Sequence, residues 1–212
     1  EQSVTTRVAD GTHASAVDSI AARALDESVF LAGADAFQAA AVGGAAGDVE
    51  VTLAPSATVD IGADTRLVAP RLDVTARADV LQRDVVALFP DAGQGNPPGL
   101  ARLVHVGSGG LLNVQDSFGA DAPTLDITPE TSVRVGEGAV MRAFPGADST
   151  GVLTIRSTGT VDIDGELLLE GYGGIQAPIG ELGIDVDGSH TVDIGSDADL
   201  YAEELLGISA MA

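Results

Sequence analysis

Two acidic turns hold the residues whose types and spacing are best suited to chemistry. Asp162 and Asp164 precede a glycine, as do Asp185 and Asp187, so that both segments read D-x-D-G. Calcium takes six to eight oxygen ligands at about 2.3–2.6 Å, and turns stacked in neighbouring coils could pool such ligands. Neither segment completes an EF-hand loop, which needs a third Asx and a glutamate at position twelve. We predict calcium ligands at Asp162, Asp164, Asp185 and Asp187, and the competing interpretation is that these carboxylates simply point outward into solvent.

Paired carboxylates also suit hydrolysis or lyase chemistry on polysaccharides. Asp162 and Asp164, one residue apart in a strand, would face the same side about 6.5–7 Å apart, a separation that a glycosidase permits. The chain has 32 acidic residues, however, so such pairs arise by coincidence, and no apolar pocket is evident that would raise the pKa of an acid catalyst. We therefore predict no enzymatic activity and keep a carbohydrate-active protein, a polysaccharide lyase or a glycan-binding protein, as the alternative.

Other constellations of reactive residues are missing from the sequence. Cysteine is absent, and His13, His105 and His190 are dispersed without partners at a recognised ligand spacing. No G-x-S-x-G motif occurs, and the Gly-rich segments 107–110 and 171–174 lack the strand-to-helix context of a phosphate loop. These segments are interpreted as turns, and apart from calcium no cofactor is expected.

The charge of the chain restricts its partners. Ten arginines and no lysine face 32 acidic residues, for a net charge of −22, and the segment from Ser157 to the end has 12 acidic residues and no arginine. Such a field repels nucleic acid and anionic membrane surfaces. No apolar run approaches the roughly 18 residues that span a bilayer. We expect neither nucleic-acid binding nor membrane insertion.

The elements that would position these residues are short strands. Apolar residues alternate with polar ones, as at Leu153 and Ile155, and Gly, Asp, Ser and Thr separate the runs. Similar runs recur at spacings of 28 to 31 residues: Leu125 lies 28 residues before Leu153, which lies 29 residues before Leu182. A fixed period of this size indicates stacked coils. The sequence therefore predicts a β-solenoid in which Leu153 lies above Leu182, with aliphatic side chains in the core.

Residues 1–44 differ in pattern from the rest. Val17, Ile20, Ala21, Ala24 and Leu25 recur at helical spacing, and a serine followed three residues later by Asp precedes them. This predicts a helix over residues 15–27, followed by a second helix or an irregular strand. The segment would serve either as a cap over the first coil or as a docking element for another subunit.

Residues 45–212 form the predicted solenoid, with one projecting loop. The segment 90–100, PDAGQGNPPGL, contains three prolines and three glycines and is too poor in apolar residues to lie in a coil. It is either a binding loop or a solvated insertion. Residues 208–211 end the chain on apolar side chains, an uncovered edge that favours further chain or a partner stacked there.

The segments 57–69 (ATVDIGADTRLVA) and 72–78 (LDVTARA) resemble coils of secreted bacterial β-helix exoproteins of the filamentous-haemagglutinin-like and leukotoxin-LktA-like type. The resemblance covers about residues 48–206, and it implies a right-handed parallel β-helix, export, and a role in adhesion or as a rigid spacer. It brings no catalytic residues. The expected fold is all-β, a parallel right-handed β-solenoid with three strands per coil and a short helical N-terminal segment.

Together these observations predict a non-enzymatic extracellular or cell-surface protein. It would be part of a long adhesin or a filament-forming subunit, with copies of itself, neighbouring repeats of a longer chain, or surface glycans as its partners. The acidic coat would keep such a rod soluble in salt.

Overall fold

The protein is built from parallel strands stacked in flat coils. The structure, a computed structural model, describes residues 2–30, 34–39, 42–46, 50–82, 102–117, 124–147, 150–163 and 166–211. All regular elements among these residues are β-strands, and every strand pairing is parallel. In the described part of the chain we find no helix with the length and hydrophobicity to cross a bilayer. The loop predicted at residues 90–100 lies outside the described residues.

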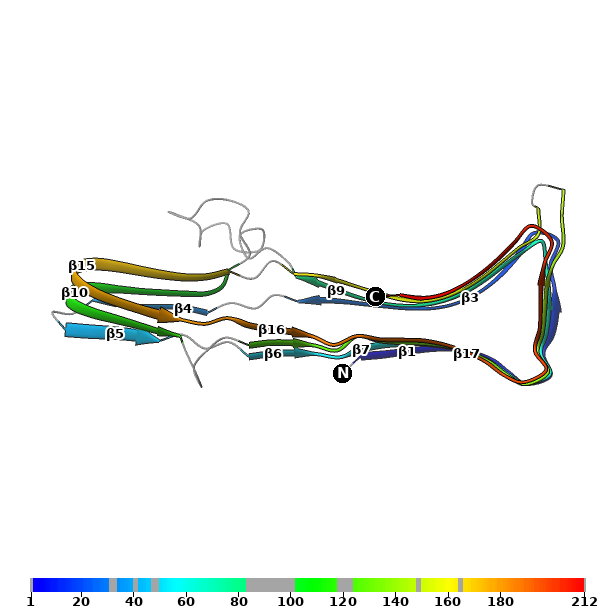
Figure 1. Cartoon of the computed structure of the whole chain (residues 1–212), viewed down its shortest axis with the longest axis horizontal. Helices are drawn as coiled ribbons and strands as arrows, with labels where there is room; N and C mark the ends of the chain where they lie inside the picture. The colour runs from blue at the N-terminus through cyan, green and yellow to red at the C-terminus, as the bar shows by residue number, and fades with distance from the viewer. Residues whose placement is uncertain are drawn as a thin grey trace.

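Each coil is a long, flattened loop whose two arms lie side by side and are joined by a short cross-strand (Figure 1). Three four-stranded sheets enclose the wide end of the loop. The outgoing sheet consists of β1 (Gln2–Val8), β7 (Pro55–Ile61), β12 (Glu130–Val135) and β17 (Ser189–Ile194). The end sheet consists of β2 (His13–Ser15), β8 (Arg66–Val68), β13 (Val140–Ala143) and β18 (Asp199–Ala202). The return sheet consists of β3 (Ser19–Phe30), β9 (Arg71–Gln82), β14 (Val152–Asp162) and β19 (Leu205–Met211).

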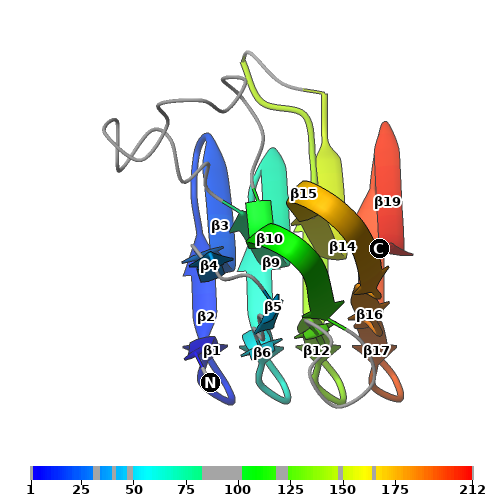
Figure 2. The same cartoon turned by 90° about the vertical axis from the view of Figure 1, so that its left-hand side faces the viewer.

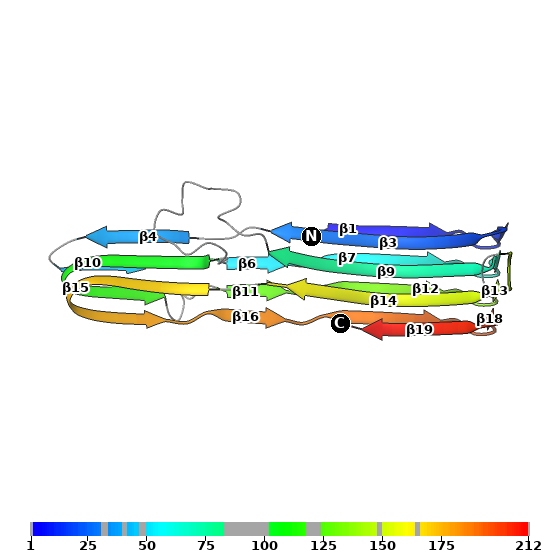
Figure 3. The same ribbon diagram turned by 90° about the horizontal axis from the view of Figure 1, so that it is seen from above.

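The narrow end of the loop is formed by two further sheets. One contains β4 (Ala34–Ala39), β5 (Val42–Ala46), β10 (Arg102–Ser117) and β15 (Glu166–Gly180). The other contains β6 (Glu50–Leu53), β11 (Thr124–Ile127) and β16 (Gly183–Val186). Successive coils lie next to one another in chain order, from the N-terminal coil to the C-terminal coil (Figures 2 and 3). Each complete coil thus passes through five sheets, whereas the sequence-based expectation is three strands per coil.

The period of the coils differs from the one inferred from the sequence. Gln2 pairs with Pro55, Ser56 with Glu130, and Glu130 with Ser189, so that successive coils are offset by 53, 74 and 59 residues. Leu153 pairs with Leu72 and Leu206, not with Leu182. The predicted stacking of Leu153 on Leu182 is therefore wrong, although the parallel, stacked arrangement is confirmed.

The spacing of 28 residues has another physical origin. The two arms of one coil run in opposite directions and carry similar runs of alternating apolar residues, which face each other across the core. Leu125 and Ile127 of β11 accordingly pack in one cluster with Val161 of β14. Val133 of β12 and Leu153 of β14 belong to the larger cluster. The repeat in the sequence therefore relates facing arms within a coil rather than successive coils.

Aliphatic columns fill the interior. The larger cluster lies between the outgoing, end and return sheets and includes Ile61, Leu72, Met141, Leu153 and Ile155, all almost fully buried. Each member stacks on its equivalent in the next coil, because parallel in-register strands place identical positions about 4.8 Å apart. No described aromatic side chain is among the largest fully buried residues, which agrees with the expected aliphatic core.

The helix predicted over residues 15–27 is wrong, because this segment forms β2, a bend and β3. Ala22 and Ala24 are buried at alternate positions, whereas Val17, which the helical pattern needs in the core, is 95% exposed. Alanine fits a helix or a strand. The parallel pairing of β3 with β9 along its whole length favours the strand. The N-terminal segment supplies β1 to β5 to the same sheets as the later coils.

Candidate functional site

Of the acidic residues predicted to bind calcium, Asp162 lies on a different arm of the coil from Asp185 and Asp187. Asp162 ends β14 on the return sheet, Asp185 lies in β16 on the other arm, and Asp187 follows β16; all three are exposed. Asp164 lies outside the described residues. Among the residues that the structure describes, no group of three or more His, Asp or Glu side chains could hold a metal ion. Calcium binding remains a prediction.

The surface near Asp185 holds an acidic depression. Asp185 pairs in register with Asp126 of β11, and with Glu50 these side chains line a shallow hollow on the three-stranded sheet. Parallel in-register strands bring the two carboxylates close together, and like charges directly opposite are unfavourable. None of its described lining residues is basic or aromatic, and the three carboxylates make its surface attractive to cations.

A repeated corner joins the outgoing sheet to the end sheet in every coil. We call it the glycine corner, and its five-residue sequences are VADGT (8–12), IGADT (61–65), VGEGA (135–139) and IGSDA (194–198). The fourth residue has a positive φ in each case: 68° at Gly11, 52° at Asp64, 66° at Gly138 and 57° at Asp197. Glycine adopts this left-handed conformation freely, and Asp is among the few other residues that tolerate it. The choice of glycine or aspartate at the fourth position therefore allows the chain to turn at this corner.

Backbone hydrogen bonds link each corner to the next. The second residue of a corner donates its N–H to the first residue of the preceding corner, as Gly136 does to the Ile61 carbonyl at 2.7 Å. The fourth residue donates to the third residue of the following corner, as Asp64 does to the Glu137 carbonyl at 2.9 Å. The corners thus form a continuous ladder that satisfies backbone groups which the strands leave unpaired.

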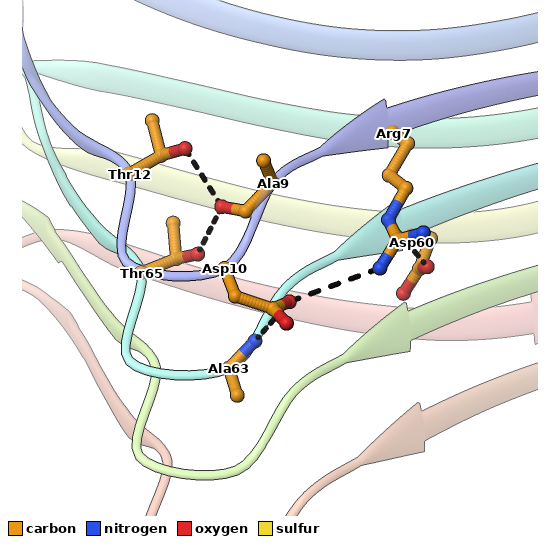
Figure 4. Close-up of polar contacts among 7 residues, drawn as sticks. All are labelled: Arg7, Ala9, Asp10, Thr12, Asp60, Ala63 and Thr65. Atoms are coloured by element: carbon orange, nitrogen blue, oxygen red, sulfur yellow. Dashed lines mark hydrogen bonds and ion pairs between the residues drawn. The ribbon is translucent and has the colours of Figure 1, made fainter.

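Side chains reinforce the first two corners (Figure 4). The hydroxyls of Thr12 and Thr65 both donate to the Ala9 carbonyl, at 2.7 and 3.3 Å. Asp10 Oδ1 accepts a hydrogen bond from Ala63 N at 3.2 Å. Arg7 Nε lies 3.5 Å from Asp60 Oδ2 in the next coil, so this ion pair also joins two coils.

The corners approach so closely that their second residue must be glycine. A Cβ at Gly136 would lie 2.5 Å from Ala63 N, and one at Gly195 would lie 2.7 Å from Glu137 N. Gly62 is equally confined, because its Cβ would lie 2.5 Å from Asp10 N. In each case the obstacle is the backbone of the preceding corner, which cannot move aside without separating the coils. Ala9, with no described coil before it, is the one corner residue at this position that carries a Cβ.

A line of alternating charge follows the outgoing sheet. We call it the charge ladder: Arg7 pairs in register with Asp60, Asp60 with Arg134, and Arg134 with Asp193. Opposite charges directly across parallel strands contribute a few tenths to about 1 kcal/mol each. Arg23 and Asp73 form a similar ion pair between the first two coils of the return sheet. The arginines are thus used to join coils.

A buried polar cluster lies inside the third and fourth coils. Thr131 Oγ1 is 2.7 Å from both Ser157 Oγ and His190 Nδ1, and Thr131 and Ser157 are almost fully buried. Glycines make room for the imidazole, since a Cβ at Gly159 would lie 2.4 Å from His190 Cε1. Desolvation lowers the pKa of His190 below its ordinary value of 6.5. Both hydroxyls are almost fully buried, and the three side chains form a hydrogen-bonded network that joins the third coil to the fourth.

Comparison with known proteins returned no match: no family model, no curated protein and no solved structure is similar to the chain.

The residues that most clearly organise the structure are those of the glycine corner and the charge ladder. The sequence reasoning overlooked both, although the corner has a visible signal. The four corner sequences begin at Val8, Ile61, Val135 and Ile194, spaced by 53, 74 and 59 residues like the coils themselves.

Proposed function

We propose that the protein is a non-enzymatic structural module of an extracellular adhesin or surface filament, in which the stacked coils themselves are the functional feature. The observation that carries the proposal is the continuity of the stack: glycine corners, charge ladder and aliphatic columns all repeat from one coil to the next. Neighbouring coils are joined by many contacts along each arm. The stack therefore resists bending, and the loss of one contact does not unfold it. Such stiffness suits a spacer that holds a binding segment away from a cell.

The finer features of the coil form part of the same proposal. We infer a right-handed coil, because crossover connections between parallel strands of one sheet are right-handed in about 98% of cases. We also infer that the three strands around the larger core, one each from the outgoing, end and return sheets, make up the basic coil, as in the β-helix exoproteins that the sequence resembles. The narrow end is an extension of that three-stranded coil.

The surface chemistry supports an extracellular location. A net charge of −22 without lysine keeps the coat hydrated and repels nucleic acid. Acidic residues on the edge strands β16, β17 and β18 also oppose uncontrolled association in the medium.

Localisation can be tested on the source cells with antibodies against the purified protein. Labelling of intact, unpermeabilised cells, and loss of the label after brief external proteolysis, are expected. Electron microscopy of the native material should then reveal elongated particles. Label that appears only after permeabilisation, or compact particles without an elongated axis, would contradict the proposal.

Glycan binding is the second candidate, and one observation favours it. Phe144 and Tyr201 are about 40% exposed, and their rings lie 5.5 Å apart at a tilt of 41°. Beside them Arg142 forms an ion pair with Asp199. Exposed aromatic faces contact the C–H faces of sugar rings, and a neighbouring ion pair can hydrogen-bond to hydroxyls. A glycan array should reveal ligands that are lost in a Phe144→Ala, Tyr201→Ala variant; no signal with the wild type would remove this candidate.

Calcium is a separate proposal, resting on the acidic turns and on the hollow beside Asp185. Bound calcium would offset the repulsion between Asp126 and Asp185, which lie directly opposite each other on β11 and β16. The midpoint of thermal unfolding should then rise with added calcium and fall with chelator. An unchanged midpoint in both conditions would exclude a structural role for the ion.

A further inference from the structure

The two ends of the stack are built differently. On the C-terminal side, Leu206 and Ile208 are 44% and 47% exposed, although their equivalents one coil earlier, Leu153 and Ile155, are fully buried. Ile184 and Val186 on the other arm are exposed to a similar degree, above the buried Leu125 and Ile127. We call this surface the C-terminal face. Its inward side chains continue the columns of the core, and none of the described residues stacks on them.

The N-terminal side closes its own core. Ala22 and Ala24 are 5% and 0% exposed although they belong to the first coil. The Thr6 hydroxyl crosses the interior and donates to the Arg23 carbonyl at 2.6 Å. Asp26, also inward and buried, accepts a hydrogen bond from Ser56 N at 3.1 Å. Small and polar inward residues therefore let the arms meet at this end, whereas the C-terminal face stays open.

The glycine corner specifies what can stack on the C-terminal face. In the repeating pattern, the next corner would donate an N–H to the Ile194 carbonyl and accept from Asp197 N. Its second residue must be glycine, because the Cβ of any other residue would meet the backbone at Gly195, as it would at Gly136 and Gly62 in the coils before. The first corner of a second copy has Ala9 there. In-register stacking of copies head to tail is thus disfavoured at this corner.

The charge ladder adds a second requirement. It alternates from Arg7 to Asp193, so that an arginine opposite Asp193 would continue it. Arg7 in the first coil of a second copy would supply that arginine, so that only the contact at Ala9 opposes head-to-tail stacking. A second copy stacked through its own C-terminal face would instead bring Asp193 toward another acidic coil, in a region of the chain without arginine. Like charges across paired strands are unfavourable. Self-association is therefore disfavoured in both orientations, by sterics in one and by charge in the other.

We propose that the C-terminal face is a docking surface for a further solenoid coil from a partner segment, distinct from the first coil of this chain. That coil carries a glycine at the second corner position, an arginine opposite Asp193 and apolar residues at its inward positions. The inference rests on the structural role proposed above but depends only on the coil geometry. A failure of the surface-labelling experiment would leave it standing.

The test adds such a coil to the protein. A second copy of residues 159–211 is joined directly to Met211, because Met211 pairs with Thr158 and the register then continues. In the added copy Asp193→Arg supplies the predicted charge. The matched control differs only by Gly195→Ala in the added copy. Hydrogen exchange of the β17 and β19 amides and binding of an apolar dye are measured, with circular dichroism to verify the fold.

With glycine in the added corner, exchange of the β17 and β19 amides should slow on the order of tenfold or more, and dye binding should fall. The alanine control should lose most of this protection. Equal protection in the glycine and alanine forms of the extended protein, or protection in neither, would overturn the proposed corner rule. The wild-type protein should sediment as a monomer, and concentration-dependent, open-ended assembly of the wild type would overturn the exclusion of a second copy.

Discussion

Substitution of Gly136 by alanine tests the argument on which the coil stack depends. The glycine lies in the third corner, and its N–H donates to the Ile61 carbonyl at 2.7 Å. A methyl group there would lie 2.5 Å from Ala63 N, 2.6 Å from the Gly62 carbonyl carbon and 2.9 Å from Ala63 Cα. All three obstacles are backbone atoms held by their own hydrogen bonds. The methyl can be accommodated only if the two corners separate.

The loss of stability expected for Gly136→Ala follows from these distances. Ordinary contact begins near 3.4 Å, so the corners must move apart by nearly 1 Å, which stretches the 2.7 Å hydrogen bond beyond its useful range. Loss of that bond costs about 1 kcal/mol, and overpacking of a well-packed site costs about 1–3 kcal/mol. The sum is about 2–4 kcal/mol. For a protein of this size each kcal/mol lowers Tm by about 2–4 °C, so Gly136→Ala should lower Tm by about 4–16 °C.

The matched control is Gly207→Ala in β19. A Cβ at Gly207 meets nothing within 4 Å, and alanine reduces the entropy of the unfolded chain, so this variant should be neutral or stabilised by about 0.4–1 kcal/mol. Thermal unfolding followed by circular dichroism, at equal concentration and salt, compares the two. A Gly136→Ala protein that melts within a degree of the wild type, or together with Gly207→Ala, would refute the close-approach argument.

Three further predictions concern the polar contacts. Thr131→Val leaves Ser157 Oγ and His190 Nδ1 without their shared partner, and urea unfolding should register a loss of about 1–3 kcal/mol; an unchanged midpoint would contradict the network. Because the folded pKa of His190 lies below 6.5, its neutral form supports stability above pH 6.5, and this support is lost as pH falls from 6.5 to the folded pKa. The difference in Tm between wild type and His190→Asn should therefore shrink from pH 7.5 to pH 5, and a constant difference would exclude this linkage. Arg134→Glu converts the alternating ladder into a run of carboxylates and should destabilise by about 1 kcal/mol at low salt, with the loss reduced in 1 M NaCl; a loss independent of salt would point to packing instead.

The strands could be predicted from the sequence because alternation is a local property. Leu153 and Ile155 are buried while their neighbours Val152 and Thr154 are not, as the pattern of period two requires. The parallel stack could also be inferred from the recurrence of such runs. The coil length could not be obtained that way, since facing arms within a coil carry the same alternation as stacked arms and recur at a shorter spacing.

The predicted helix failed for a different reason. Alanines at residues 21, 22 and 24 satisfy helical and extended spacing equally well, so that local propensity does not decide between them. Tertiary pairing with β9 over the full length of β3 supplies hydrogen bonds that an isolated short helix would have to form alone. The small side chains are explained by the closure of the core at the first coil, a constraint that only the assembled stack reveals.

The acidity of the chain also takes on a structural meaning. Asp64 and Asp197 occupy left-handed positions that few residues other than glycine tolerate. Asp60 and Asp193 belong to the charge ladder, where each opposes Arg134. A part of the negative charge is thus required by corners and ladders whether or not a cation binds. Acidic turns in a sequence of this type are therefore weak evidence for calcium, and the spacing of G-x-D or G-x-G corners is the better guide to how its coils are stacked.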